Sequence, residues 1–393
     1  MPTRPCWVEI HTRAFEDNFR LLAAIAAPHA ELLAVVKADA YGHSLALCAP
    51  AAVRAGACWL GVTSVEEGVA ARAACPHTQI LVIGGAFPGQ GAEVVRHGLT
   101  AVVWEQEQLD ELENAAKEFG IRPLPVHLEI DTGMSRQGTD SACLSSLLAR
   151  FATSSPLRLE GVMTHLFAAD EADGRVTERQ LTQMGEILGR VLAAGLHPEW
   201  LNVGNSAALL AAQAGRIASL ASRHGMKALL RPGLALYGLP PKFDPPFAPQ
   251  EPPVLTEARL RLQPVLGWKS KVVCVRSIPA GTVVGYNGTF VATEAMRLAL
   301  VAVGYADGLD RRLGNHFSLL VRGQRTPLVG RVSMDQAVLD VTGVPGIASG
   351  DEVVILGTQG NETITAFDHA EAAETIPWEV FIRIGPRVSR IAV

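Results

Sequence analysis

The stretch Ala34-Val35-Val36-Lys37-Ala38-Asp39-Ala40-Tyr41-Gly42-His43 joins an apolar run to a lysine near the start of the chain. The run from Leu32 to Val36 predicts a short strand that is buried on both faces. Lys37 ends this strand abruptly, and a partly desolvated amine loses its proton more easily than a solvated one. Lys37 is therefore a candidate nucleophile or base. Taken alone, it fits a surface lysine whose stem lies along the strand end better than a reactive one.

The composition of the 393 residues indicates a large globular protein. Hydrophobic residues make up 48% of the chain and charged residues 19%, which argues against disorder. The length exceeds that of most single domains, so we expect two. The net charge of -5 provides no polybasic surface, and we expect no nucleic-acid partner. The first residues lack the pattern of a secretory signal and no apolar stretch is long enough to span a bilayer, so we expect no membrane association and a cytoplasmic location.

The six cysteines are scattered along the chain, and none forms a Cys-x-x-Cys pair. Each lies in apolar sequence, so we expect reduced, buried thiols rather than disulfides or a zinc site. We expect no bound metal.

Strand-like and helix-like segments alternate over the first 240 residues. Counting the strand before Lys37, eight apolar runs fit buried strands: 32–36, 59–63, 80–84, 100–104, 126–130, 157–165, 200–205 and 228–231. Such alternation argues for a parallel sheet, and eight units argue for a closed (β/α)8 barrel of the TIM type. An open doubly wound sheet is the alternative, but no Gly-x-Gly-x-x-Gly follows the first of these strands.

Local signals mark some of the helices and one additional strand. Residues 6–11 read as an isolated strand, and we place residues 1–11 outside the barrel. Thr12 can cap a helix that presents Phe15, Phe19 and Leu22 on one face. Helices are also expected over 45–55 and 65–74, the second opened by a capping box in which Ser64 is followed by Glu67.

The pattern changes in a segment where prolines crowd together, residues 241–253, which we interpret as a linker. Beyond it, residues 254–393 contain short apolar runs separated by Gly, Pro, Asn and Asp, at 272–278, 298–303, 317–321, 337–341 and 352–356. This pattern predicts a mostly β C-terminal domain with one short helix near 366–373. The expected domains are thus a barrel over 1–240 and a β domain over 254–393.

Polar residues stand where the expected barrel strands end, and that edge carries the active site in such barrels. They are Lys37, Arg136, His165, the pair Asn205-Ser206, and Arg231 with Gly233. Any one of them could be structural: His165 could be a satisfied core histidine and Ser206 a helix cap. Their shared position favours a functional interpretation.

Seven stretches of the sequence together resemble the alanine racemases, a family of pyridoxal-phosphate-dependent enzymes. They occur in the family's order and cover nearly the whole chain. They are the Lys37 stretch, Ile130-Asp131-Thr132-Gly133-Met134-Ser135-Arg136, Thr164-His165, Asn205-Ser206-Ala207-Ala208, Arg231-Pro232-Gly233-Leu234 with Tyr237-Gly238, Gly304-Tyr305-Ala306-Asp307-Gly308 and Ser333-Met334-Asp335-Gln336.

The resemblance implies that Lys37 binds pyridoxal 5′-phosphate covalently, and that the cofactor makes the α-proton of an amino acid removable. It implies that the phosphate is held by Tyr41, Asn205-Ser206 and the backbone N–H groups of Gly233 and Leu234, where glycine permits close approach. His165 would lie against the pyridine ring. Arg231 would face the pyridine nitrogen and, because arginine stays protonated, keep that nitrogen unprotonated.

Racemisation needs a base on each face of the α-carbon. By resemblance, Lys37 serves one face and Tyr286 serves the other. Arg136 would lower the pKa of Tyr286 and would also contact the substrate carboxylate. The backbone of Met334 would provide a second contact to that carboxylate. In the family the tyrosine comes from the partner subunit, so the resemblance implies a homodimer with shared sites. A turn tyrosine in a hairpin is the structural alternative for Tyr286.

Three positions depart from the best-known members of the family. Glu129 stands where many carry a carbamylated lysine that orients Arg136, and a glutamate could pair with Arg136 without carbon dioxide. Ser333 replaces a cysteine beside Met334. Trp378 replaces a tyrosine that narrows the substrate entrance and touches the phosphate; an indole is larger and only donates.

Four functions compete for this sequence. The first is racemisation of alanine, for cell-wall peptidoglycan or for alanine catabolism. The second is racemisation of serine or a broader range of amino acids, favoured if Trp378 reshapes the entrance. The third is a barrel-type pyridoxal-phosphate decarboxylase, which should lack Tyr286 and has its barrel inserted within the β domain. The fourth is a cofactor-carrier protein built from a barrel alone, against which the β domain argues.

Overall fold

The chain folds into two compact units in the computed structural model, which describes residues 4–151 and 155–393. The first, which we call the barrel unit, comprises Arg13–Ala40 and Leu45–Gln263. The second, the β unit, comprises the residues up to Thr12, the four residues Tyr41–Ser44, and Pro264–Val393. The chain thus leaves the barrel unit for four residues, and it does so within the Lys37 stretch, at Tyr41.

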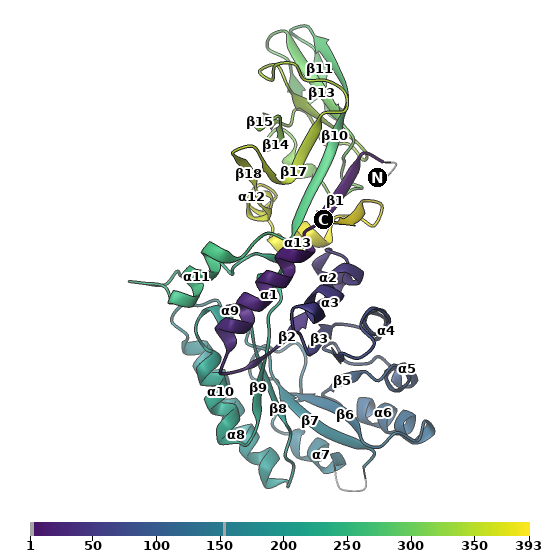
Figure 1. Ribbon diagram of the computed structural model, residues 1–393, viewed down its shortest axis with the longest axis vertical. Helices are drawn as coiled ribbons and strands as arrows, with labels where there is room; N and C mark the ends of the chain where they lie inside the picture. Colours follow the sequence, from purple (N-terminus) through teal and green to yellow (C-terminus); the bar gives the residue numbers. More distant parts are fainter. Residues whose placement is uncertain (1–3, 152–154) are drawn as a thin grey trace. The chain divides into compact units, whose positions relative to one another are not determined.

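Eight parallel strands form a closed barrel in the order of the sequence (Figure 1). They are β2 (Glu31–Val35), β3 (Trp59–Val62), β4 (Gln79–Val82), β5 (Thr100–Val103), β6 (Leu124–Glu129), β7 (Leu157–Met163), β8 (Trp200–Asn205) and β9 (Lys227–Arg231). The barrel closes where Glu31 of β2 pairs with Leu229 of β9. This confirms the predicted (β/α)8 fold, and each predicted strand overlaps an observed one.

Helices surround these strands on the outside of the barrel (Figure 1). They are α1 (Thr12–Ala26), α3 (Leu45–Arg54), α4 (Val65–Ala74), α5 (Gly91–Arg96), α6 (Gln106–Glu118), α7 (Leu144–Leu148), α8 (Arg175–Ala193), α9 (Ser206–Leu210), α10 (Ala214–Arg223) and α11 (Pro253–Arg261). Phe15, Phe19 and Leu22 of α1 are buried together, as the spacing predicts. α11 begins within the proline-rich segment and was not anticipated, since a proline is tolerated at a helix start.

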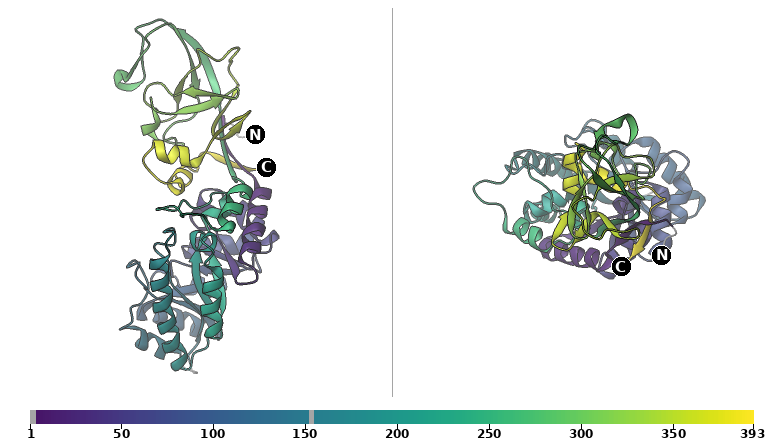
Figure 2. Two further views of the ribbon diagram at one scale, coloured as in Figure 1. Left: turned by 90° about the vertical axis from the view of Figure 1, so that its left-hand side faces the viewer. Right: turned by 90° about the horizontal axis from the view of Figure 1, so that it is seen from above.

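The β unit is built on a nine-stranded sheet. Its strands are β1 (Cys6–Ile10), β10 (Leu266–Ile278), β13 (Met296–Val301), β14 (Ser318–Val321), β15 (Gln324–Pro327), β16 (Ala337–Asp340), β17 (Glu352–Gln359), β18 (Glu362–Ile364) and β19 (Ser389–Ala392). β1 pairs antiparallel with β10 and parallel with β19, so the first and the last strand of the described chain are neighbours in this sheet (Figure 2). The C-terminal part is mostly β, as predicted.

Two helices complete the β unit where the sequence predicted one. α12 (Ala366–Ala372) lies at the predicted place, and α13 (Pro377–Ile382) follows it. A two-stranded hairpin, β11 (Val283–Val284) and β12 (Phe290–Val291), was also not predicted, since strands of two residues are too short to show alternation.

The expectation of buried cysteines is wrong for half of them. Cys58, Cys143 and Cys274 are exposed. Each lies at a loop, a helix start or an outer strand face, where an apolar neighbourhood in sequence does not translate into burial in space.

Candidate active site

Lys37 follows the end of β2 and precedes a left-handed turn. The N–H of Val36 donates to Gly61 O at 2.8 Å, which keeps the chain in the sheet up to the lysine. The next four residues, Ala38 to Tyr41, then have φ between 52° and 55°. This conformation costs about 1–2 kcal/mol for each L-residue, so the surrounding structure must hold it in place.

Glu67 of α4 helps to hold this turn in place. Its carboxylate accepts hydrogen bonds from the N–H of Ala38 at 2.6 Å and from the N–H of Thr63 at 2.8 Å. The predicted capping box is therefore only half formed: Ser64 Oγ accepts from the N–H of Glu67 at 3.3 Å, but Glu67 binds elsewhere. Sequence reasoning missed this role, because Glu67 and Ala38 are 29 residues apart.

Arg231, the last residue of β9, is buried and held by four acceptors. Its Nη1 donates to Asn202 O at 2.7 Å and Asn202 Oδ1 at 2.5 Å. Its Nη2 donates to Thr164 O at 3.0 Å and lies 3.2 Å from His165 Nδ1. For Nε, no hydrogen bond is recorded within the described part of the chain. Burial lowers the pKa of Arg231 to about 10, which still leaves it protonated at neutral pH.

His165, half-buried after β7, is an uncharged imidazole. Burial, followed by the charges of Arg231, Arg136 and Lys37, lowers its pKa to about 3. Because Arg231 can only donate, His165 Nδ1 must accept its hydrogen bond and the ring proton lies on Nε2. A neutral imidazole of this kind can lie against an aromatic ring without adding a charge.

Ser206 organises the loop after β9. Its Oγ accepts from the N–H of Gly233 at 3.0 Å and from the N–H of Ala235 at 3.3 Å. The helix cap expected of Ser206 is made by its neighbour instead, since Asn205 Oδ1 accepts from the N–H of Ala208 at 3.0 Å. The Ser206 hydroxyl proton remains available to donate, and no partner is recorded for the N–H of Leu234 among the described residues.

Arg136 and Glu129 line a small pocket with Asp131, Met134, Gln137, Thr164 and His165. Glu129 is almost fully buried, and its carboxylate accepts from Gln137 Nε2, which also donates to Ile83 O at 3.1 Å. The anticipated pair between Glu129 and Arg136 is not formed: over the described residues no hydrogen bond or ion pair joins them. Arg136 is exposed, so its guanidinium is accessible to a ligand.

The site as a whole favours anions and a deprotonated lysine. Burial, reinforced by the charge of Arg136, lowers the pKa of Lys37, while Glu67 opposes the shift. Burial raises the pKa of Glu129, and the hydrogen bond from Gln137 and the charges of Arg231 and Arg136 only partly counter it. Arg231 and Arg136 thus lie near a buried carboxyl, Glu129, that resists ionisation.

Three predicted site residues, Tyr41, Tyr286 and Met334, belong to the β unit. Tyr41 follows the left-handed turn, and burial raises its pKa to about 12. Tyr286 opens the short 3-10 turn of the β11–β12 hairpin and is 67% exposed. Met334 is 54% exposed. Its carbonyl accepts from the N–H of Ala306 at 3.0 Å, and within residues 4–151 and 155–393 its own N–H has no recorded partner.

The backbone brings the Tyr286 hairpin beside the loop that carries Met334. Gly285 and Gly330 both have positive φ, at 75° and 74°. A Cβ on Gly330 would lie 2.9 Å from Val284 O, so only glycine permits this approach. The Met334 loop is fixed further by Arg387, whose Nη1 pairs with Asp335 at 2.8 Å and whose Nε binds the buried carboxylate of Asp307 at 2.7 Å.

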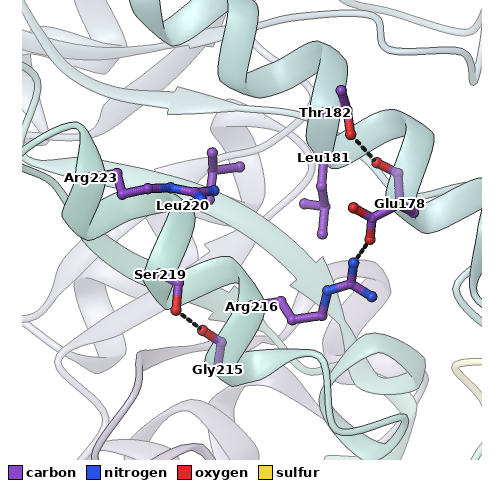
Figure 3. Close-up of a pocket in the computed structure, with 8 residues that line it drawn as sticks. All are labelled: Glu178, Leu181, Thr182, Gly215, Arg216, Ser219, Leu220 and Arg223. Atoms are coloured by element: carbon purple, nitrogen blue, oxygen red, sulfur yellow. Dashed lines mark hydrogen bonds and ion pairs between the residues drawn. The ribbon is translucent and has the colours of Figure 1, made fainter.

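A second hollow lies on the outer side of the barrel between α8 and α10 (Figure 3). Several of its polar groups bind one another: Glu178 pairs with Arg216, and Ser219 Oγ donates to Gly215 O at 2.8 Å. It contains none of the strand-end residues. The described residues also contain no group of three or more His, Cys, Asp or Glu placed to bind a metal ion. In the same residues, no helix is both long and apolar enough to cross a membrane.

These features define a class of protein: a (β/α)8-barrel enzyme whose site is centred on a lysine, joined to a β unit that carries an exposed tyrosine. The family model described as the alanine racemase N-terminal domain matches residues 10–241, and that of the C-terminal domain matches residues 265–392. The chain belongs to the alanine racemase family, whose members are isomerases.

Named relatives agree over nearly the full length. The chain is 36% identical to the alanine racemase of Nostoc sp. over 98% of this chain and 95% of the relative. It is 38% identical to the alanine racemase of Symbiobacterium thermophilum over 98% of this chain and 97% of the relative. Among solved structures, alanine racemase from Streptomyces coelicolor A3(2) matches with a TM-score of 0.87 at 34% identity, covering 99% and 98% of the two chains. The Bartonella henselae enzyme with covalently bound pyridoxal phosphate matches with a TM-score of 0.83 at 27% identity over both full chains.

Proposed function

We propose that this chain interconverts L- and D-alanine with pyridoxal 5′-phosphate bound covalently to Lys37. The observation that carries the proposal is the lysine itself, which is half-buried, held by a strained turn, and shifted towards its neutral form in a cationic site. Relatives of similar length are named alanine racemases, and a neighbouring structure holds the cofactor covalently.

The donor set of the barrel unit fits this cofactor. The Ser206 hydroxyl and the Leu234 N–H are available to a phosphate, while Gly233 acts by donating its N–H to Ser206. Tyr41 and Asn205 complete the proposed phosphate-binding residues, Asn205 through the helix start that it caps. The one N–H of Arg231 without a recorded partner in the described structure, on Nε, suits an acceptor nitrogen on a heteroaromatic ring. A neutral His165 suits the face of that ring.

When bound, the cofactor withdraws electrons from the substrate and makes its α-proton removable. Lys37 removes or returns that proton at Nζ on one face, and its lowered pKa leaves a larger neutral fraction for the task. Tyr286 does the same at its hydroxyl on the opposite face. Arg136 and the N–H of Met334 orient the substrate carboxylate.

We propose further that the enzyme is a homodimer in which Tyr286 and Met334 act in the partner's site. Support comes from their exposure in the β unit: large side chains that serve chemistry yet remain accessible suit a role across an interface. Such a contact would also cover apolar surface contributed by Val283, Val291 and Tyr305, which are exposed.

Other aspects of the function rest on the same proposal. We place the enzyme in the cytoplasm, with a role in peptidoglycan precursor supply or alanine catabolism. The functional division into 1–240, a linker over 241–253 and 254–393 stays a prediction. Trp378, which is 37% exposed, is the one position that favours the second candidate, a racemase with serine or a broader substrate range.

Two measurements test the proposal. Borohydride reduction of the purified yellow protein should fix the cofactor on Lys37, as peptide mapping would show; a label on Lys117 or Lys269 would contradict the assignment. Loss of optical activity should then be followed for a panel of L-amino acids. Alanine should give the highest kcat/KM, whereas faster racemisation of serine would favour the second candidate.

A further inference from the structure

A column of buried polar side chains runs through the barrel interior beneath the proposed site. It begins at Arg231 and passes through Asn202 of β8 to His127 of β6 and Glu160 of β7. Asn202 Nδ2 lies 3.3 Å from His127 Nδ1, and His127 Nε2 lies 3.7 Å from Glu160 Oε2. Glu160 Oε1 accepts from Arg158 Nη2 at 2.7 Å. Asn202 and His127 are completely buried, and Glu160 is 4% exposed.

The barrel wall is shaped to admit the imidazole. A Cβ on Gly161 of β7 would lie 2.6 Å from His127 Cε1 and within 2.8 Å of both ring nitrogens. Any other residue at 161 would therefore displace the ring. The register between β6 and β7 also shifts next to His127, where Val126 pairs with Leu159 but His127 pairs with Gly161. The extra residue on β7 is Glu160, and a bulge of this kind redirects a side chain.

Hydrogen-bond chemistry fixes the orientation of each member. Arginine has no acceptor, so Asn202 must present Oδ1 to Arg231 and its Nδ2 to His127. His127 Nδ1 must then carry the lone pair, and the ring proton lies on Nε2 and points to the carboxylate of Glu160. No hydrogen bond is recorded for Nε2 or for Glu160 Oε2 in the described structure, so each is a buried polar atom whose nearest complement is the other.

The charges agree with this arrangement. Burial lowers the pKa of His127, with Arg231 and Arg158 acting in the same direction and Glu160 opposing. Burial alone would raise the pKa of Glu160, but the contacts with His127 and Arg158 hold it below its ordinary value. A neutral imidazole thus directs its Nε2–H towards an ionised carboxylate, 3.7 Å away.

We propose that His127 is a positioning residue for racemisation, which acts through the Asn202 amide to hold Arg231 with its Nε–H directed into the site. An Asn202 amide without this partner can rotate, and a rotated amide presents Nδ2 to a guanidinium that has only donors. Two further residues support His127 in this role. Gly161 leaves room for the His127 ring, and Glu160 fixes its tautomer. The proposal rests on the proposed function only for the role of Arg231.

The first test reads the tautomer directly and does not depend on activity. Solid-state 15N NMR of the full-length enzyme labelled in histidine should show, in addition to the signals of His165 and His369, an imidazole with unprotonated Nδ1 and protonated Nε2 from pH 6 to pH 9. The same signal should be missing in the His127→Gln enzyme, which assigns it. A charged ring, or a proton on Nδ1, would overturn the proposal.

The second test compares variants in the holoenzyme. His127→Leu removes the acceptor for Asn202 and should lower kcat by about tenfold with little change in KM for alanine, a loss typical of removed supporting hydrogen bonds. His127→Gln, whose amide can both accept from Asn202 and donate to Glu160, should restore most of kcat. His369→Leu is the matched control, because His369 is a buried histidine of the β unit whose Nε2 lies 2.7 Å from Ile355 O. It should affect stability alone.

Gly161→Ala should displace the His127 ring without replacing it, and should therefore lower kcat as His127→Leu does. Gly189→Ala on α8 is its control, since a Cβ there meets nothing within 4 Å. Unchanged kcat in both His127→Leu and Gly161→Ala would overturn the proposal. If His127→Leu fails to fold, the tautomer and Gly161→Ala decide the question. A wild-type enzyme without racemase activity but with the expected tautomer would refute the proposed function and leave the column intact.

Discussion

Two ionisable residues of the site are shifted in opposite senses by the same cause. Burial disfavours charge, so it lowers the pKa of the Lys37 amine and raises the pKa of the Glu129 carboxyl. The nearby arginines add to the first shift and subtract from the second. Both groups are thereby moved towards neutrality, which suits a site whose lysine must act as a nucleophile and base.

Replacing Arg136 should make Lys37 less reactive. Loss of the positive charge in Arg136→Gln removes a repulsion that lowers the lysine pKa, so that pKa should rise and the neutral fraction at pH 8 should fall. The rate of cofactor attachment to cofactor-free protein, followed by absorbance from pH 7 to pH 10, should then have its midpoint at higher pH. Arg136→Lys, which keeps the charge, should leave the midpoint near that of the wild type. A midpoint that moves down in Arg136→Gln would contradict the electrostatic explanation.

Glu129→Gln should stabilise the protein at neutral and alkaline pH. Because the pKa of Glu129 is raised in the folded state, stability falls as the pH rises from the ordinary value of 4.5 through the folded-state pKa. Above that pH the ionised carboxylate destabilises the fold, by about 1.4 kcal/mol for a pKa difference of one between folded and unfolded protein. A neutral glutamine escapes this penalty and can still accept from Gln137. The gain in Tm should thus be present at pH 8 and shrink towards pH 5.

Glu160→Gln is the control for the Tm measurement on Glu129→Gln, because it should change Tm in the opposite direction. The pKa of Glu160 is held below its ordinary value, so the folded state favours its charge at neutral pH. Its replacement should lower Tm at pH 8. Equal effects from both substitutions would mean that the pKa shifts do not govern the stability of these sites.

At the scale of elements, the sequence revealed the barrel because the signals were periodic and local. Each of its strands is an apolar run of four to seven residues, and each lies where the run stands in the sequence. The elements that escaped prediction lack such a signal. The β11–β12 strands have two residues each, and α11 and α13 both begin at prolines that the sequence alone associates with loops.

The sequence indicated which residues form the site better than it indicated which partners they contact. Strand ends marked Lys37, His165 and Arg231, and the structure brings these together in the barrel unit. The partners of Glu129 and Glu67 could not be anticipated, since Gln137 and Ala38 meet them only after the loops fold. The left-handed turn is also invisible in sequence, because three of its four residues are Ala or Asp and none is glycine.

That turn leads to a prediction about Ala38, which has φ of 52° and is exposed. Glycine has no steric penalty in this conformation, so Ala38→Gly should raise Tm, by the equivalent of about 1 kcal/mol. Ala38→Val should lower it, because a β-branched residue is strained at positive φ. The matched control is Ala70→Gly in the exposed face of α4, where the same change should lower stability by about 1 kcal/mol. Thermal unfolding of the three variants checks both signs.

At the scale of the whole molecule, the proposed chemistry is divided between two compact units of one chain. The barrel unit holds the lysine, the ring-facing arginine and most of the phosphate-binding groups. The β unit holds Tyr286 and Met334, both exposed. An enzyme that separates its two bases in this way can complete its site only by bringing a β unit to a barrel, and a symmetric homodimer does so twice.

A mixed-dimer experiment distinguishes a shared site from a site made within one chain. Lys37→Ala and Tyr286→Phe homodimers should each be nearly inactive, because every site lacks one base. After the two variants are unfolded and refolded together in equal amounts, random pairing makes about half of the dimers mixed. If Tyr286 serves the partner, each mixed dimer has one site with both lesions and one site with neither, so about a quarter of wild-type activity should return. The control is each variant refolded alone, which should regain nothing. If Tyr286 serves its own chain, every site in the mixture keeps one lesion, no activity returns, and the shared site must be abandoned.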